Sequence, residues 1–359
     1  MAKSPPKRIE KVRNSVVKRL LSDIYYTPDT SFFEFKPTEL PNQRPFDDYR
    51  SNLVRFELFF LTVKDFSTIM GMLNVTLIGL GRVGGSLVTA LLKGDVRVRQ
   101  VIVRDKSRRI GEFEEQLDVL GWDDLRRIDS EVVIIATGDS EIAGVDARLA
   151  DLEGLSGSVV LHTSGLLSSD VLARSREVGA FVGSMHPLAS FPDAVSGWAN
   201  FDGASFCLEG DAKAVAVAEE MVELLGGESF TVPSEFKALY HAAAVMACGN
   251  LVALLSESVR MLKRCGLSEE DALKRLRPLV MGTVSNVFTN GPAESLTGPF
   301  ARLDVDAATK DLEAVESMDD RALTEIFVGL GRLSVHIASQ NGGDIQKVGR
   351  MLQEIRMEK

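Results

Sequence analysis

Two patterns of hydrophobic and polar residues divide the chain. Between Leu73 and Phe230, short β-branched runs alternate with amphipathic stretches of helical period. This alternation is typical of βαβ units around a parallel sheet. The predicted strands are 75–79, 101–104, 132–137, 158–162, 181–185 and 205–209, and clear helical periodicity covers 84–93 and 212–225.

The short β-branched runs stop after Phe230. The rest of the chain has the pattern of helices, with breaks at Gly266, Pro278, Gly291 and 341–343. The sequence therefore predicts an α/β Rossmann domain with a parallel twisted sheet, followed by an all-helical C-terminal domain. We assign residues 70–232 to the dinucleotide-binding domain. Residues 233–359 form the predicted helical domain for substrate binding and dimerisation.

Residues 1–69 are an N-terminal extension of different composition, with 12 Lys or Arg against 9 Asp or Glu and 8 of the 18 Phe. The extension lacks the long apolar core and small-residue cleavage site of a secretory signal. Met70 and Met72 stand directly before the first predicted strand. Because its periodicity is weak, we interpret the extension either as an appended, disordered segment or as the result of a start placed too far upstream.

Composition excludes several classes of protein. A net charge of -10 argues against nucleic-acid binding, which needs clustered Lys and Arg. The three cysteines are odd in number and widely spaced, which suits neither a disulfide framework nor a zinc site. No stretch reaches roughly 18 uninterrupted apolar residues, so no membrane span is expected. We predict a soluble cytoplasmic protein without a metal site.

The strongest motif is the segment NVTLIGLGRVGGSLVTALLKG, in which Gly79, Gly81 and Gly84 form G-x-G-x-x-G between a buried strand and an amphipathic helix. In dinucleotide-binding folds, the first glycine permits a tight turn, the second lets the backbone approach the pyrophosphate, and the third lets helix and strand pack closely. Free N–H groups at the helix N-terminus then face the phosphates. The predicted cofactor-binding residues are Gly79, Leu80, Gly81, Arg82, Val83, Gly84, Arg104, Thr137 and Ser164.

Arg104 decides the expected cofactor. It ends the strand that follows the glycine motif, where an Arg pairs with the 2′-phosphate of NADP and an acid binds the ribose hydroxyls of NAD. Arg108 and Arg109 stand nearby in support. Asp105 follows directly, however, and would favour NAD. We predict NADP, with NAD as the alternative.

Three further segments carry a resemblance: LHTSG at 161–165, GSMHPLASF at 183–191, and YHAAAVMACGN at 240–250 followed by LTGPFARLD at 296–304. Together they resemble a bacterial family of Rossmann-like proteins, assigned as NADP-dependent oxidoreductases, whose C-terminal part is a domain of unknown function of the 6-phosphogluconate dehydrogenase C-terminal type. The resemblance covers 73–332 and leaves out the extension. It departs from the family pattern at Leu303, where Gly is expected, and at Asp311, where His is common.

The resemblance implies a reaction class. The layout is also similar, more distantly, to 6-phosphogluconate, β-hydroxyacid and prephenate dehydrogenases and to pyrroline-5-carboxylate reductase, all of which transfer hydride with a nicotinamide cofactor. It implies a homodimer as well. It does not identify the substrate, which we expect to be a small molecule.

Hydride transfer to a carbonyl or imine needs a proton donor beside the nicotinamide. His186 precedes Pro187 at a predicted strand end, and its HP segment resembles the one that carries the catalytic His of prephenate dehydrogenases. Lys237 and His241 are spaced i, i+4 on a helix, so they share one face with Tyr240. We predict His186, Lys237 and His241 as catalytic residues. The alternatives are a structural His at the strand end, an exposed Lys and a hydrogen-bonded core His.

Three functions remain open at this stage. The leading hypothesis is an NAD(P)-dependent oxidoreductase that transfers a hydride between nicotinamide and a small acid, keto acid or imine. A prephenate-type dehydrogenase is the first alternative. The second is a sensor or scaffold that binds NADP(H) without turnover, because sites rather than folds decide function.

Overall fold

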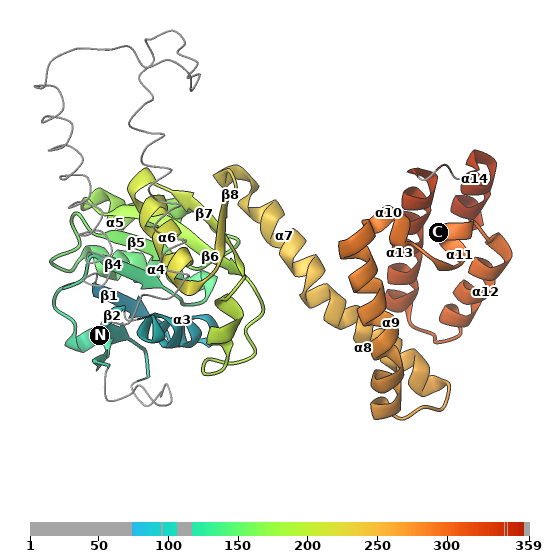
Figure 1. Ribbon diagram of the computed structural model, residues 1–359, viewed down its shortest axis with the longest axis horizontal. Coiled ribbons are helices and arrows are strands. Elements are labelled where there is room, and N and C mark those ends of the chain that lie inside the picture. Colours follow the sequence, from blue (N-terminus) through green and yellow to red (C-terminus); the bar gives the residue numbers. More distant parts are fainter. Residues whose placement is uncertain (1–73, 95, 106–116, 341, 343, 355–359) are drawn as a thin grey trace, which may run out of the picture. The chain divides into compact units, whose positions relative to one another are not determined.

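The computed structural model describes residues 74–94, 96–105, 117–340, 342 and 344–354 (Figure 1). The described residues before Met246 form one compact unit, and those from Met246 onward form a second. The observed division lies later than residue 232 because helix α7 (Lys237–Ala247) begins inside the first unit. The extension 1–69 and the pair Arg108 and Arg109 lie outside the described residues.

Within the described residues, eight strands form one sheet in the order β3-β2-β1-β4-β5-β6-β7-β8. The order reverses between β1 and β4, which is the switch point of a Rossmann sheet. The strands are β1 (Asn74–Ile78), β2 (Arg97–Ile102), β3 (Val119–Leu120), β4 (Val132–Ile135), β5 (Val159–His162), β6 (Phe181–Leu188), β7 (Ser205–Gly210) and β8 (Glu228–Thr231). A Rossmann fold with a mostly parallel sheet confirms the predicted class.

Two strands, β7 and β8, run opposite to the other described strands. β7 pairs antiparallel with β6, whereas a fully parallel sheet was expected. A parallel pair needs a crossover of a dozen or more residues, usually a helix. The segment between β6 and β7 contains only a short 3-10 turn, Gly197–Phe201, and returns the chain alongside β6 in the opposite direction.

Two short strands escape sequence-based detection. β3 has two residues, and all four residues of β8 are exposed, so neither shows an apolar run or a buried alternation. β8 still extends the sheet, because the helix between β7 and β8 makes them a parallel pair.

Helices cover both faces of the sheet (Figure 1). α3 (Arg82–Lys93) and α6 (Ala212–Leu225) pack on alternate residues such as Leu77 and Ile134. α4 (Asp139–Ala150) packs on the other set, including Ile135 and Val160, and the short α5 (Ala173–Glu177) follows a 3-10 turn, Ser169–Leu172, on that side. The buried residues of β4 are all apolar, whereas β1 also buries Thr76, whose hydroxyl is hydrogen-bonded to Ser130.

On the face of the sheet that α4 covers, the side chains become more polar toward β7. His162 of β5 is the register partner of Ser184 of β6, and Ser184 in turn faces Glu209 of β7. His186 lies two residues beyond Ser184 and faces Cys207. Because side chains on one face alternate along a strand, these five form a polar stripe, defined as His162, Ser184, His186, Cys207 and Glu209. The stripe is where a functional site can be built.

The second unit is helical in its described residues. Its small core contains Leu303, Val335 and Met351, while large apolar side chains on its first two helices are exposed. The helices are α8 (Gly249–Arg264), α9 (Glu269–Asn290), α10 (Pro292–Ser295), α11 (Gly298–Arg302), α12 (Val305–Glu316), α13 (Arg321–Gln340) and α14 (Ile345–Glu354).

One expectation for the helical part needs correction. Pro278 lies inside α9 and does not end it; the position is exposed, so water can satisfy the carbonyl that loses its hydrogen bond. By length and composition, the helical stretch Ser234–Arg264 is also apolar enough to cross a membrane, with a mean hydropathy of 1.7 over a window that is not buried in the described structure. Such a window is weak evidence for a span.

Candidate functional site

The glycine turn after β1 has the geometry that its spacing predicts. Gly79 has a φ of +98°, a left-handed conformation that side chains disfavour. A Cβ on Gly84 would lie 2.0 Å from the carbonyl oxygen of Gly79, so only a glycine lets α3 pack this closely. A Cβ on Gly81, in contrast, would meet nothing within 4 Å. Gly81 therefore leaves an open approach to the backbone.

The remaining predicted cofactor residues surround this approach. Leu80 is buried, Val83 is half-buried and Arg82 is exposed as the first residue of α3. The first turn of α3 contains no acidic side chain, and no side chain caps it. At the neighbouring end of β4, the hydroxyl of Thr137 is buried without a hydrogen-bond partner. Open backbone, an uncapped helix N-terminus and an unpartnered hydroxyl fit a dinucleotide pyrophosphate.

Arg104 follows β2 at the same edge of the sheet. Its side chain is 83% exposed and forms an ion pair with Glu141 in the first turn of α4. The guanidinium is thus within reach of solvent and already has an anionic partner. A 2′-phosphate would have to compete with the carboxylate of Glu141 for it.

His186 and the first turns of α7 form a second group of side chains. The Nδ1 atom of His186 lies 2.6 Å from the hydroxyl of Tyr240. The His186 and His241 rings meet edge to face at 6.3 Å between centroids. Tyr240 also contacts the ring of Phe230 on β8. α7 therefore places Tyr240 and His241 on one helical face against the end of β6.

Lys237 lies at the start of this helix and is 1% exposed. Its ammonium group donates to the hydroxyl of Ser184 at 2.8 Å and to the carbonyl of Ser164 at 3.2 Å. The structure thus contradicts the alternative of an exposed lysine. Lys237 joins α7, the polar stripe on β6 and the loop after β5.

The loop after β5 is held by His162. Its Nδ1 accepts the backbone N–H of Ser164, and its Nε2 lies 3.2 Å from the carbonyl of Ser168, to which it can only donate. The hydroxyl of Ser164 accepts the backbone N–H groups of Leu166 and Leu167. Ser164, predicted to bind the cofactor, thus uses its side chain to shape this loop.

Partial or full burial and nearby charge favour the neutral form of both His162 and His186. Burial, then Lys237, then His241 lower the pKa of His186 from 6.5 to about 4. Burial and Lys237 also lower the pKa of His162 to about 4, although the hydrogen bond that His162 donates to the carbonyl of Ser168 acts to raise it. Burial raises the pKa of Tyr240, so its phenol keeps its proton at neutral pH. Burial lowers the pKa of Lys237.

These protonation states are compatible with one particular direction of hydrogen bonding. Since Tyr240 keeps its proton, its O–H can donate to Nδ1 of His186, which leaves the proton of the neutral imidazole on Nε2. The described residues provide no hydrogen-bond partner for this Nε2 atom. In this tautomer Nε2 is a donor, and it lies on the other side of the ring from the hydrogen bond with Tyr240.

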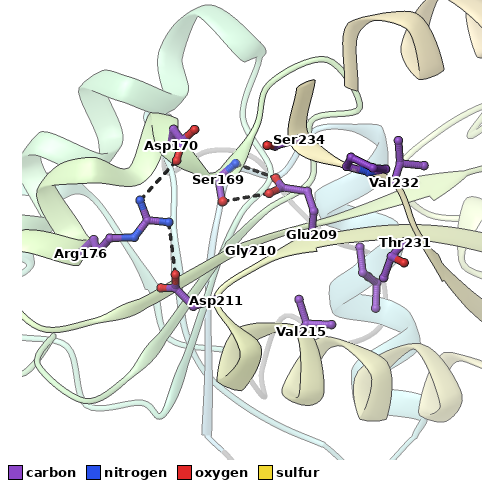
Figure 2. A pocket seen from close by; sticks show the side chains of 12 residues that line it. Ser169, Asp170, Arg176, Glu209, Gly210, Asp211, Val215, Thr231, Val232 and Ser234 are labelled. Carbon is purple, nitrogen blue, oxygen red and sulfur yellow. Dashed lines mark hydrogen bonds and ion pairs between the residues drawn. The ribbon is translucent and has the colours of Figure 1, made fainter. Parts of the chain in front are cut away.

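A separate cavity of about 510 Å³ lies at the Glu209 end of the polar stripe (Figure 2). There, the carboxylate of Glu209 accepts the backbone N–H and the hydroxyl of Ser169, and Arg176 lies between Asp170 and Asp211. The cavity includes none of the three histidines or Tyr240. Its charges satisfy one another, so we place the candidate active site at His186 instead.

The structure brings together most of the residues that the sequence singled out. His186, Lys237 and His241 meet around Tyr240, and the carboxyl ends of β1 and β4 carry the glycine turn and Thr137. Sequence reasoning missed the stripe residues Ser184, Cys207 and Glu209. The i, i+2 spacing of Ser184 and His186 in GSMHPL was the available signal.

Comparisons with known proteins agree with this architecture. Residues 64–187 match the model of a Rossmann-like domain, and 204–333 match a domain of unknown function, DUF2520. The chain joins a Rossmann-like domain to a DUF2520 domain. This confirms the resemblance predicted from the LHTSG, GSMHPLASF and YHAAAVMACGN segments.

Solved structures share the fold of this chain. Protein TM1727 from Thermotoga maritima is 26% identical, with a TM-score of 0.60 over 75% of this chain and 100% of its own. BF3122 from Bacteroides fragilis, provisionally assigned as an NADP oxidoreductase, is 20% identical, with a TM-score of 0.62 over 74% of this chain and 99% of its own. An imine reductase from a Pseudomonas species is 20% identical, with a TM-score of 0.55 over 78% and 99%. No curated protein matches the chain.

Opposite effects are expected at two glycines of the turn. Gly81→Val places a side chain in open space and in an extended conformation (φ −73°, ψ −167°), so the protein should fold normally and lose nucleotide binding by at least about tenfold. Gly84→Ala forces a Cβ onto a carbonyl and should cost about 1–3 kcal/mol of stability or more. Calorimetric titration with NADPH and denaturant unfolding measure the two effects. Unchanged affinity in folded Gly81→Val would disprove the pyrophosphate assignment.

His162 should make the protein sensitive to acid. Its folded pKa of about 4 lies below its unfolded value of 6.5, so the unfolded chain takes up the proton first as pH falls. The stability from a neutral His162 is present above pH 6.5 and is lost between 6.5 and 4, by about 3 kcal/mol in total. His162→Gln should lack this component. Denaturant unfolding across that pH range, compared between the two proteins, checks it; parallel curves would refute the buried neutral imidazole.

Proposed function

We propose that this protein is an NAD(P)-dependent oxidoreductase, with NADP as the preferred cofactor, that transfers a hydride between nicotinamide and a small acid, keto acid or imine. The observation that carries the proposal is the position of two groups at one edge of the sheet. The glycine turn follows β1, and His186 lies near the end of β6, which runs parallel to β5, β4 and β1. Ligands of such sheets bind outside the carboxyl ends of the strands.

In this proposal His186 handles the proton of the reaction. When bound, NADP(H) supplies or accepts the hydride. The Nε2 proton of His186 is directed by the Tyr240 hydrogen bond, and the neutral ring can donate it to a carbonyl oxygen or imine nitrogen. A neutral imidazole is a weaker acid than an imidazolium ion, and it is also the form present at neutral pH.

His241 and Lys237 have different parts in the same proposal. His241 lies beside His186 and is half-buried, so it can contact substrate. Lys237 is buried under Ser164 and Ser184 and cannot reach substrate directly in this geometry. We propose that Lys237 positions the loop and makes the surroundings of His186 electropositive, which favours an electron-rich oxygen or nitrogen there.

The shared fold supports the reaction class coarsely. Besides the imine reductase, the solved structures with this fold include a reductive aminase from Aspergillus terreus in complex with NADPH and ethyl-5-oxohexanoate, 17% identical with a TM-score of 0.56 over 79% of this chain and 99% of its own. That enzyme holds a nicotinamide cofactor on the same architecture. We extend the cofactor type, and not its substrate, to this chain.

We also propose a cytoplasmic homodimer formed through the helical unit. Its helices α8 and α9 expose large apolar side chains in the described structure, among them Val252, Leu279, Met281 and Phe288 at 61–87% exposure. Exposed apolar surface of this kind marks an interface. A second copy of the chain would cover it, which light scattering of the purified protein measures directly. The free thiols of Cys248 and Cys265 are consistent with a reducing compartment.

Single-turnover oxidation of bound NADPH tests the reaction class. With a panel of keto acids, ketones and cyclic imines, at least one compound should oxidise NADPH in the wild type, and His186→Gln should slow that step by roughly 10²–10⁴-fold at similar NADPH affinity. His336→Gln, on α13 of the helical unit, is the matched histidine control and should react normally. A wild type that binds NADPH and oxidises it with no compound would instead support a sensor.

Arg104 should determine the choice between NADP and NAD. Losing one charge-assisted contact to the 2′-phosphate costs about 1.5–3 kcal/mol, or roughly ten- to a hundredfold in NADP affinity. Arg104→Ala should therefore weaken NADP far more than NAD. Glu141→Gln removes the competing carboxylate and should strengthen NADP binding. Equal losses of both cofactors in Arg104→Ala, or a wild type that prefers NAD, would assign the role to Asp105.

A further inference from the structure

Gly165 lies between the two imidazoles of the candidate active site. It is buried in the loop after β5. A Cβ at this position would lie 2.8 Å from both Cε1 and Nε2 of His186, and 2.9 Å from Nδ1 of His241. Carbon atoms do not approach ring atoms this closely, so the present geometry excludes any side chain at Gly165.

The backbone of Gly165 does not itself require glycine. The glycines with left-handed φ include Gly79 and Gly210, but Gly165 is not among them. An alanine could therefore adopt the same backbone conformation without strain. Space for the two imidazoles, rather than conformational freedom, is what the missing side chain provides.

The loop cannot easily move to make room. His162 binds it through Ser164 and Ser168. The Ser164 hydroxyl accepts two further backbone N–H groups, and the Ser164 carbonyl accepts from buried Lys237. Moving the Cα of Gly165 away from the rings would break several of these buried hydrogen bonds and leave their donors and acceptors unpaired, which destabilises the folded protein.

The imidazole rings can move more easily than the loop. The His186 atoms near Gly165 are at the far end of its side chain, and among the described residues that end has one hydrogen bond, which the Tyr240 hydroxyl donates to Nδ1. The Nδ1 atom of His241 is buried without a hydrogen-bond partner. A side chain at residue 165 would therefore rotate one or both rings before it displaced the loop.

We propose that Gly165 is a positioning residue for His186 and His241: the anchored loop holds its bare Cα against both rings and thereby fixes their orientation. The ring of His186 is held from two sides, by Tyr240 at Nδ1 and by Gly165 at the Cε1–Nε2 edge. Its Nε2 proton keeps one direction as a result. The catalytic consequence rests on the proposed function, whereas the positioning itself does not.

Gly165→Ala in the full chain tests the positioning by NMR of the histidine side chains. The ring signals of His186 and His241 should shift, and the pKa of His186 should rise from about 4 toward 6.5 as the ring turns toward solvent. The backbone amide signals of Ser164 and Leu166 should stay in place. Gly144→Ala, on the exposed side of α4 with nothing within 4 Å of its Cβ, is the control and should change none of these signals. Unchanged histidine signals, or a loop that moves instead, would overturn the proposal.

A second variant covers the case in which Gly165→Ala folds poorly. His186→Ala removes the ring that the new Cβ meets, so the double variant Gly165→Ala/His186→Ala should recover part of the stability lost by Gly165→Ala alone. Strictly additive losses in denaturant unfolding would show that the His186 ring is not the obstacle, and would contradict the proposal.

The turnover rate of Gly165→Ala tests whether the positioning of the rings matters for the reaction. With any compound that oxidises bound NADPH in the wild type, Gly165→Ala should lower kcat by roughly tenfold or more and leave NADPH affinity within about twofold. Shifted rings with unchanged kcat would overturn the catalytic part of the role. If no compound reacts in the wild type, the proposed function fails, while the NMR result still decides whether Gly165 positions the rings.

Discussion

The candidate site depends on the burial of one ammonium group. Lys237 places a cation at 1% exposure, and such a group is stable only when its hydrogen bonds are made inside the protein. Its partners are Ser184 on β6 and Ser164 in the loop after β5, so a single side chain ties together a strand, a loop and the first turn of α7. Tyr240 and His241 lie three and four residues further along that helix and are placed by the same attachment.

The electrostatics of the site follow from this contact. Burial lowers the pKa of both His162 and His186, and the charge of Lys237 acts in the same direction. Neutral His162 then holds the loop after β5, and neutral His186 has one ring nitrogen without a partner among the described residues. The difference between them is hydrogen bonding: both nitrogens of His162 have backbone partners, whereas only Nδ1 of His186 has a partner among the described residues.

Local patterns predicted much of the fold. Each of the six predicted strands overlaps an observed strand, and the glycine turn has the expected shape, because buried β-branched runs and positive-φ glycines are properties of short segments. The direction of β7 and the presence of β8 could not be read in this way, since both depend on how neighbouring strands pair. The predicted helix break at Pro278 was wrong, because a long helix can contain a proline where its surroundings are exposed to water. Within the site, His186, Lys237 and His241 were visible as residue types at strand and helix ends, but the role of Gly165 depends on distances between segments far apart in the sequence.

The polar stripe also affects the chain while it is being synthesised. The strands that carry His162, Ser184 and Glu209 leave the ribosome before Lys237 does, so the place that the Lys237 side chain later occupies is at first empty. An apolar gap of that kind would attract other chains. This one is lined by hydroxyl, imidazole and carboxylate groups that water can solvate until α7 docks. The groups that hold Lys237 in the folded protein are thus groups that water can solvate in the growing chain.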